Sequence, residues 1–305
     1  MEEIVEDVVV HRDMKVCELI DIYRKIHGFV ASSIAHAIDI LHEMIKECDI
    51  RFLTFTGNLI ATGLRGIIAQ LIASRLFNVV ITTCGAIDHD IARAFGGKYY
   101  KGHFDANDLE LHDKGIHRLG NIFIPIQSYG PLIEKVVYKI MDELISSKKE
   151  WSVAELLHEF GNRIEDRYSI LRAAASANVP IFVPGIVDGA FGTALFTYSE
   201  LKKFRLNLFL DMKKLSDMIF SARKLGALII GGGISKHHAI WWAQFKDGLD
   251  YAVYITTAVE WDGSLSGAKP REAISWGKIK PRSKNVIVYG DATVILPIIA
   301  ALIIA

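Results

Sequence analysis

The stretch Ala227-Leu228-Ile229-Ile230-Gly231-Gly232-Gly233 places an unbroken apolar run directly before three glycines. A continuous run, rather than an alternating one, is typical of a strand in a parallel sheet that helices cover on both faces. Glycine at the end of such a strand allows a tight turn and lets a ligand approach the backbone. The stretch therefore predicts one strand–turn–helix unit of an α/β fold.

Similar apolar runs recur on both sides of this stretch, and helical patterns separate most of them. They lie at 52–55, 79–82, 122–124, 181–183, 251–255 and 286–288. Ser152 and Glu155 have the spacing of a capping box and predict the start of one connecting helix. With no linker, repeat or low-complexity segment, the chain predicts a doubly wound, mostly parallel sheet with helices on both faces, in a single domain.

The composition excludes several classes of protein. Of the 305 residues, 51% are apolar, and 35 basic residues balance 35 acidic ones. A disordered chain is poor in apolar residues, and a protein that binds nucleic acid through phosphates usually has a basic excess. We therefore expect a large core, no nucleic-acid partner, and no steering by net charge.

The ends of the chain and its cysteines bear on its location. Acidic residues stand at the start, where a secretory signal needs positive charge. The apolar run 292–305 is too short to span a bilayer and predicts a buried C-terminal helix that could pack against another subunit. Cys17, Cys48 and Cys84 have no paired spacing, so we expect neither a disulfide framework nor a cysteine zinc site. A cytoplasmic protein without a membrane segment fits these features.

Loops rich in glycine, threonine and aspartate follow the predicted strands. They lie at 56–58, 83–90, 184–189, 231–233, 256–258 and 290–292. The carboxyl ends of parallel strands share one edge of a sheet, where helix N-termini receive phosphates, so a nucleotide would fit there. Neither the G-x-G-x-x-G nor the P-loop motif occurs, so such a site is built differently. The alternative is that these glycines are only turns and caps.

Single polar residues in these loops also have two interpretations. Asp188 and Asp291 could accept hydrogen bonds from ribose hydroxyls, or they could be helix N-caps. His237 and His238, near a helix start, could be a neutral base or structural donors. The run Asp88-His89-Asp90 contains residue types that bind metal ions. Three adjacent residues do not converge easily on one ion, so we predict no metal site.

The last third of the chain resembles deoxyhypusine synthase. The resemblance rests on GGGISKHH (231–238), DYAVYITTA (250–258), DGSLSGA (262–268) and EAISWGKI (272–279). It extends from about Arg51 to the C-terminus and implies a Rossmann-like NAD-binding domain over 31–305, after an N-terminal segment 1–30. It also implies a homotetramer with active sites between paired subunits.

The resemblance implies a transferase reaction. The family oxidises spermidine with NAD and moves the four-carbon aminobutyl unit, through an enzyme–lysine imine, onto one lysine of the hypusine-containing translation factor. Lys278 matches the imine-forming lysine and His237 the general base. The chemistry agrees, because a lysine must lose its proton before it attacks and a desolvated pocket favours the neutral amine.

The binding residues carry over by position. Those matching the NAD site are Gly57, Asn58, Leu59, Ile60, Ala61, Thr83, Cys84, Gly85, Asp188, Thr257, Ala258, Asp291 and Ala292. Those assigned to the spermidine pocket are Asp88, His89, Gly232, His237, Gly263, Ser264, Glu272 and Trp276.

The amine pocket departs from the eukaryotic pattern. His89 stands where that pattern has Glu, and Thr193 and Leu265 where it has Asp, so three carboxylates are lost. Spermidine carries about three positive charges, which a dry pocket must pair. The remaining candidates are Asp88, Asp90, Glu260, Asp262 and Glu272, and Trp276 can add a cation–π contact.

The adjacent tryptophans after the histidine pair have two interpretations, and the function has two alternatives. Trp241 and Trp242 replace small polar residues of the eukaryotic pattern, and core packing is favoured for them over substrate stacking. A homospermidine synthase-like enzyme, which transfers the same unit to a small amine, is one alternative function. A non-catalytic NAD-binding relative is the other, and the presence of both His237 and Lys278 argues against it.

Overall fold

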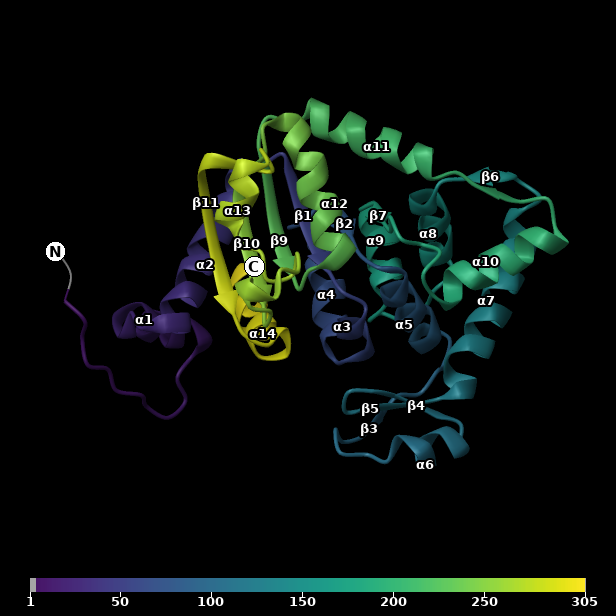
Figure 1. Cartoon of the computed structure of the whole chain (residues 1–305), viewed down its shortest axis with the longest axis horizontal. Coiled ribbons are helices and arrows are strands. Elements are labelled where there is room, and N and C mark those ends of the chain that lie inside the picture. Colours follow the sequence, from purple (N-terminus) through teal and green to yellow (C-terminus); the bar gives the residue numbers. More distant parts are fainter. Residues whose placement is uncertain (1–3, 305) are drawn as a thin grey trace. The chain divides into compact units, whose positions relative to one another are not determined.

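A six-stranded, mostly parallel sheet organises the fold. The computed structural model describes residues 4–304, and the strand order in its main sheet is β11-β10-β9-β1-β2-β7. The pairs β10–β11, β9–β10 and β2–β7 are all parallel. Six of the seven predicted apolar runs lie in this sheet, which confirms the α/β fold class (Figure 1).

The contacts within the chain group into two compact units. The terminal unit contains the residues up to Thr54, Leu76–Asn78 and the residues from Ser216 onward. The central unit contains Phe55–Arg75 and Val79–Leu215. Helix α11 (Leu208–Ser221) has residues in both.

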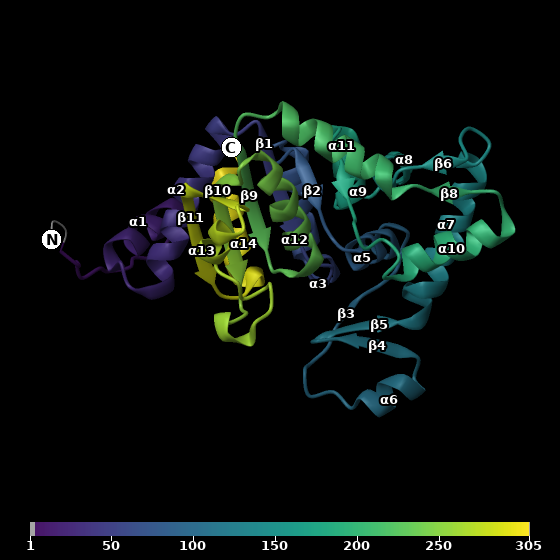
Figure 2. The ribbon, with the colours of Figure 1, turned by 45° about the horizontal axis from the view of Figure 1, so that its top comes forward.

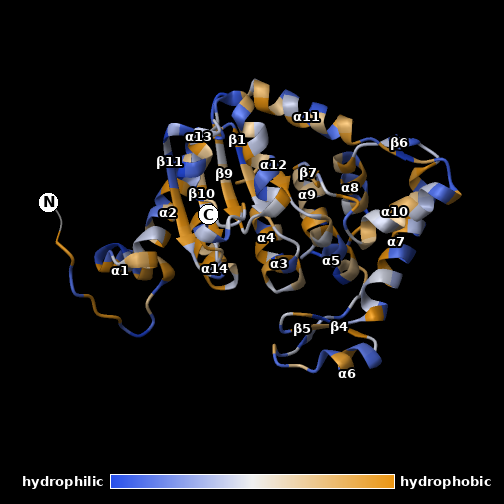
Figure 3. Cartoon of the chain, viewed as in Figure 1, coloured by the Kyte–Doolittle hydropathy of each residue, from blue (hydrophilic) through white to orange (hydrophobic). Residues whose placement is uncertain are grey.

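The terminal unit consists of four strands and their covering helices. Its strands are β1 (Ile50–Phe55, whose last residue belongs to the central unit), β9 (Leu225–Ile230), β10 (Leu249–Thr256) and β11 (Ile279–Tyr289). Its helices are α1 (Val16–Ile26), α2 (Phe29–Glu47), α12 (Gly233–Ala243), η2 (Gln244–Lys246), η3 (Glu260–Asp262), α13 (Pro270–Ser275) and α14 (Ala292–Ile303). Every residue of β9 is buried, and the hydropathy colouring shows β9 as a largely hydrophobic strand (Figure 3).

The C-terminal helix packs into this unit. Helix α14 contacts β10, α1 and α2, and its buried side chains include Leu296 and Ile299. The predicted buried C-terminal helix is thus confirmed up to Ile303, while Ala305 lies outside the described residues. Within residues 4–304, no helix combines the length and hydropathy that a membrane crossing needs.

The central unit is mostly helical. Its helices are α3 (Asn58–Ala61), α4 (Leu64–Ala73), α5 (Cys84–Ala94), α6 (Asp108–Asp113), η1 (Ile126–Ser128), α7 (Gly130–Leu144), α8 (Val153–Asn162), α9 (Ile170–Ala177) and α10 (Ala190–Leu201). Its strands are β2 (Val79–Ile81), β3 (Tyr100–Lys101), β4 (Ile116–Leu119), β5 (Ile122–Pro125), β6 (Glu150–Trp151), β7 (Ile181–Phe182) and β8 (Arg205–Leu206). The predicted capping box is confirmed, because Ser152 and Glu155 cap the start of α8 reciprocally.

One predicted parallel strand is antiparallel. The run Ile122–Ile124 lies in β5, which pairs antiparallel with β3 and β4 in a separate sheet of three strands (Figure 2). The two residues Gly120-Asn121 join β4 to β5, and so short a connection permits only a hairpin. The parallel assignment of this run is therefore wrong.

Candidate active site

The end of α13 turns Lys278 into the protein. Trp276 is the C-cap, and Gly277 follows with φ of +68°, a conformation that glycine adopts without strain. The Gly277 amide donates to the Ile274 carbonyl at 3.0 Å and the Lys278 amide to the Ala273 carbonyl at 3.0 Å, which is the Schellman pattern. After this turn Trp276 stays 67% exposed, whereas Lys278 is only 9% exposed.

Two indole rings surround the Lys278 amine. Its Nζ lies 5.0 Å from the ring centroid of Trp276 and 5.9 Å from that of Trp241. The Leu249 amide donates to the Lys278 carbonyl at 3.1 Å, which fixes the lysine backbone to the start of β10. Lys278 thus stands at the amino end of β11, in a largely desolvated aromatic pocket.

His237 approaches the same pocket from α12. Residues four apart share a helix face, and the imidazole of His237 stacks on Trp241 with centroids 5.8 Å apart and planes at 22°. Burial lowers the pKa of His237, and the positive charge of Lys278 lowers it further. The ring is therefore neutral at physiological pH and can accept a proton.

Lys236 is a site residue that the sequence reasoning did not select. Its side chain is 1% exposed, and its Nζ donates to the carbonyls of Leu265 at 2.7 Å and Ala268 at 2.8 Å. The same Nζ lies 4.2 Å from the ring centroid of Tyr254, and burial lowers its pKa to about 8. Its position between the three glycines and the two histidines of the same motif was the sequence signal that could have identified it.

This lysine holds the loop that carries Gly263 and Ser264. A Cβ on Gly232 would lie only 2.2 Å from Ser266 Oγ, so the start of α12 and the loop pack backbone against side chain. Within this loop the Ser264 amide donates to the Asp262 carboxylate at 2.6 Å. Glu272 is exposed on α13, and its negative charge raises the pKa of Lys236 against the effect of burial. Lys236 therefore positions predicted substrate residues.

We expect Lys236→Met to free the loop 259–269 and lower activity. Hydrogen bonds from a charged donor contribute about 1.5–3 kcal/mol each, and the substitution removes both. Limited proteolysis with mass spectrometry should show faster cleavage within 259–269. Lys246→Met is the control, because Lys246 makes one long bond of 3.3 Å to the Phe220 carbonyl. Equal cleavage rates for both variants would contradict the anchoring role.

The predicted NAD residues of the central unit follow β1 and β2. Gly57 packs so tightly against the start of α5 that a Cβ on it would lie 2.8 Å from the Ala86 nitrogen. The first turn of α5 contains no acidic residue, and its N-cap Thr83 makes no side-chain cap bond. Cys84 is buried at this helix start, and the side chains of Leu59, Ile60 and Ala61 are buried in the core.

The predicted NAD residues of the terminal unit follow β10 and β11. The Gly290 amide donates to the Thr256 carbonyl at 2.9 Å and joins the two strand ends, next to Thr257 and Ala258. Asp291 is the N-cap of α14, where it accepts from the Thr293 amide at 2.7 Å before Ala292. In the central unit, by contrast, Asp188 is exposed and precedes the N-cap Gly189 of α10, so the N-cap interpretation fits Asp291 only.

Asp88 caps the start of α10, a helix far from it in sequence. Its carboxylate accepts from the Ala190 amide at 3.0 Å, the Phe191 amide at 2.7 Å and the Tyr129 hydroxyl at 3.0 Å. Burial raises the pKa of Asp88, and these donors oppose that shift. Asp88 therefore satisfies the first amides of α10, and its contact with a polyamine stays a prediction.

His89 lies among tyrosines rather than carboxylates. Its Nδ1 is 2.7 Å from the Tyr99 hydroxyl, and its ring contacts Tyr99 edge-on and Tyr129 at a tilt. Burial lowers the pKa of His89 to about 4, with a smaller effect from the charge of Arg93. A neutral imidazole thus occupies the position where the eukaryotic pattern has a carboxylate.

Two other candidate carboxylates form ion pairs. Asp90 is fully buried and pairs with Arg65 at 2.6 Å, and Glu260 pairs with Lys269 at 2.6 Å. Thr193 donates to the Gly189 carbonyl at 2.9 Å within α10. Among residues 4–304 there is no group of three histidine, cysteine or acidic side chains that could hold a metal ion.

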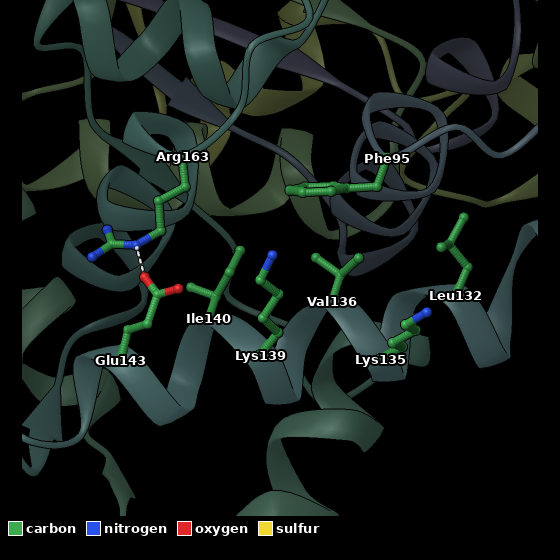
Figure 4. A pocket seen from close by; sticks show the side chains of 8 residues that line it. All are labelled: Phe95, Leu132, Lys135, Val136, Lys139, Ile140, Glu143 and Arg163. Atoms are coloured by element: carbon green, nitrogen blue, oxygen red, sulfur yellow. Dashed lines mark hydrogen bonds and ion pairs between the residues drawn. The ribbon is translucent and has the colours of Figure 1, made fainter.

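A groove of about 440 Å³ on the central unit lies apart from these residues. Its lining is Phe95, Leu132, Lys135, Val136, Lys139, Ile140, Glu143 and Arg163. Figure 4 shows α7 along one side and the Arg163–Glu143 ion pair at one end. The groove lining includes none of the residues predicted for catalysis or binding.

Comparisons with known proteins identify the family. The sequence model of the family described as deoxyhypusine synthase matches residues 18–303. A "Probable deoxyhypusine synthase" of Sulfurisphaera tokodaii is 65% identical over 91% of this chain and 89% of its own length. Another of Ignicoccus hospitalis is 55% identical over all of this chain and 97% of its own length.

Solved structures share the fold. The crystal structure of a "putative deoxyhypusine synthase" from Entamoeba histolytica has a TM-score of 0.64 and 21% identity, covering 95% of this chain and 93% of that one. That likeness supports the fold alone. Family match and high identity over nearly full length, together with the fold, show that this chain belongs to the deoxyhypusine synthase family.

Proposed function

We propose that this transferase moves the aminobutyl group of spermidine onto a lysine of the hypusine-containing translation factor, with NAD as cofactor. The observation that carries the proposal is the arrangement around Trp241 in the terminal unit. The amine of Lys278 lies 5.9 Å from this indole, and His237 stacks on it. A buried amine and a neutral base are the two groups that imine exchange requires.

The residues of this chain would act in the following order. When bound, NAD supplies the oxidation of spermidine to its imine and the final reduction of the product imine. His237 accepts a proton from the reacting amine, and the neutral Lys278 amine attacks the imine carbon. A C=N bond to Lys278 forms as the C–N bond to diaminopropane breaks, and the leaving amine takes a proton. The acceptor lysine then displaces Lys278 by the same exchange.

The residues present fit NAD. The uncapped first turn of α5, with Thr83, Cys84 and Gly85, can receive a pyrophosphate on its backbone amides, and glycine at 57 keeps the adjoining loop close. In the terminal unit Asp291 uses one carboxylate oxygen on Thr293, and its second oxygen can accept from a ribose hydroxyl. We therefore propose both sets as cofactor residues.

We also propose spermidine and the translation factor as substrates, a homotetramer as the assembly, and the cytoplasm as the location. The family resemblance supports the homotetramer, and a translation factor as substrate fits the cytoplasm. The balance of 35 basic and 35 acidic residues gives no support for a nucleic-acid partner.

A product assay tests the proposal. The enzyme is incubated with NAD and labelled spermidine, with the translation factor or putrescine as acceptor, and a reaction without NAD is the control. We expect diaminopropane in both NAD reactions and label transfer to the factor. Transfer to putrescine alone would replace the proposal with homospermidine-type chemistry, and absence of diaminopropane would overturn the proposed reaction.

A further inference from the structure

The two adjacent tryptophans of α12 have different surroundings. Trp242 is 8% exposed and packs in the core, as predicted, whereas Trp241 is 42% exposed. The core-packing prediction is therefore wrong for Trp241. Successive helix residues point about 100° apart, so only one of such a pair can face the core.

Trp241 is the central ring of an aromatic row. His237 stacks on it one turn earlier, and Phe245 meets it edge-on one turn later, with centroids 6.0 Å apart and planes at 85°. Rings four residues apart along a helix are neighbours, so each limits the rotation of the next. The row holds the indole plane nearly parallel to the imidazole of His237.

The same indole faces the amine of Lys278. Within residues 4–304, Lys278 forms no ion pair, and its Nζ lies over the rings of Trp241 and Trp276. In the same unit Glu260 is already paired with Lys269. The positive charge at this buried nitrogen is therefore balanced by the negative faces of two indoles rather than by a carboxylate.

We propose that Trp241 is a positioning residue that orients His237 and, with Trp276, holds the positive charge on the Lys278 nitrogen. This inference rests on the proposed function. The nitrogen is positively charged at two stages, as the ammonium before His237 removes its proton and again as the protonated imine formed after the neutral amine has attacked. The two indole faces can thus stabilise both states without moving, which suits a unit in which Leu265 stands where the eukaryotic pattern has an aspartate.

Substitutions of matched size separate the aromatic face from simple packing. Trp241→Phe keeps a ring, and Trp241→Met fills space without one. We expect Trp241→Met to lower kcat and the amount of borohydride-trapped imine by about tenfold, and Trp241→Phe to lower both by less than about threefold. Phe220→Met is the control, because Phe220 is an exposed ring on the part of α11 that belongs to the terminal unit.

The pH profile gives a readout that a purely structural residue would not change. Burial lowers the pKa of His237, and loss of the indole exposes this ring, so its pKa should rise toward the ordinary value. The acidic limb of kcat/KM for Trp241→Met should therefore move to higher pH, while that of Phe220→Met should not.

The outcomes distinguish this inference from the proposed function. If the unaltered enzyme traps no imine, the proposed function fails. If it traps imine and Trp241→Met matches it in amount and pH profile, only the role of Trp241 is refuted. If Trp241→Met does not fold, the Trp241→Phe and Trp241→His variants replace it. Because their rings differ in how well they face a positive charge, equal losses of kcat and trapped imine in the two would also refute the role of Trp241.

Discussion

Lys278→Ala should lose at least about a thousandfold in kcat and all borohydride-trapped adduct, because the proposed function assigns the enzyme imine to this amine. The Schellman turn at Gly277 places the Lys278 amine beside the indole rings of Trp276 and Trp241. Spermidine binding should weaken much less, since the lysine acts in bond exchange rather than in holding the substrate. Mass spectrometry of the trapped protein and a diaminopropane assay measure both effects.

Two further variants define this result. Lys278→Arg keeps a positive charge in the pocket but cannot form the imine, so it should be as inactive as Lys278→Ala. Lys284→Ala removes another lysine of β11, which pairs with Glu43 at the surface, and should keep nearly full activity. An adduct on any residue other than Lys278 would contradict the mechanism.

Asp90→Ala should destabilise the central unit by about 3–5 kcal/mol, because it leaves a buried guanidinium without its main partner. Arg65 donates to Asp90 at 2.6 Å and to Asp166 at 2.5 Å. Asp90 also accepts from the Ser169 hydroxyl at 2.6 Å and the Leu171 amide at 3.0 Å, and so caps α9. Urea unfolding of the holoenzyme measures the loss.

A double variant isolates the cost of the unpaired charge. Asp90→Leu combined with Arg65→Met should recover much of the stability, because a buried pair replaced as a whole leaves no uncompensated charge. Arg24→Met is the control: this arginine pairs with Asp39 at the surface and should contribute less than about 1 kcal/mol. A double variant as unstable as Asp90→Ala would show that the cap on α9, rather than the ion pair, dominates.

Apolar runs predicted strands well but not their partners. The run 227–230 lies in the fully buried β9, as a continuous apolar pattern implies. The run 122–124 has a similar composition but joins a hairpin. Three apolar residues carry no information about strand direction, which depends on the length of the connection to the next strand.

Lys278 and His237 could be selected from the sequence as the proposed catalytic pair, whereas the hydrogen-bond partners of the acids near His89 could not be predicted from it. Lys278 and His237 lie in specific motifs, and the structure places both next to Trp241. Asp88 and Asp90 are two residues apart on α5 but cap different helices, with partners 103 and 81 positions away. No local pattern encodes such distant acceptors of helix amides.

The sequence by itself determined the fold class and the family, and it pointed to Lys278 and His237 as the reacting residues that we propose. These depend on local signals, namely apolar runs, glycine turns and short motifs, which act over a few residues. Only the tertiary structure decided what surrounds each charge: two indoles at Lys278, two carbonyls at Lys236, helix amides at Asp88 and an arginine at Asp90. Desolvation makes those partners decisive, because a buried charge is stable only where distant segments supply compensating groups.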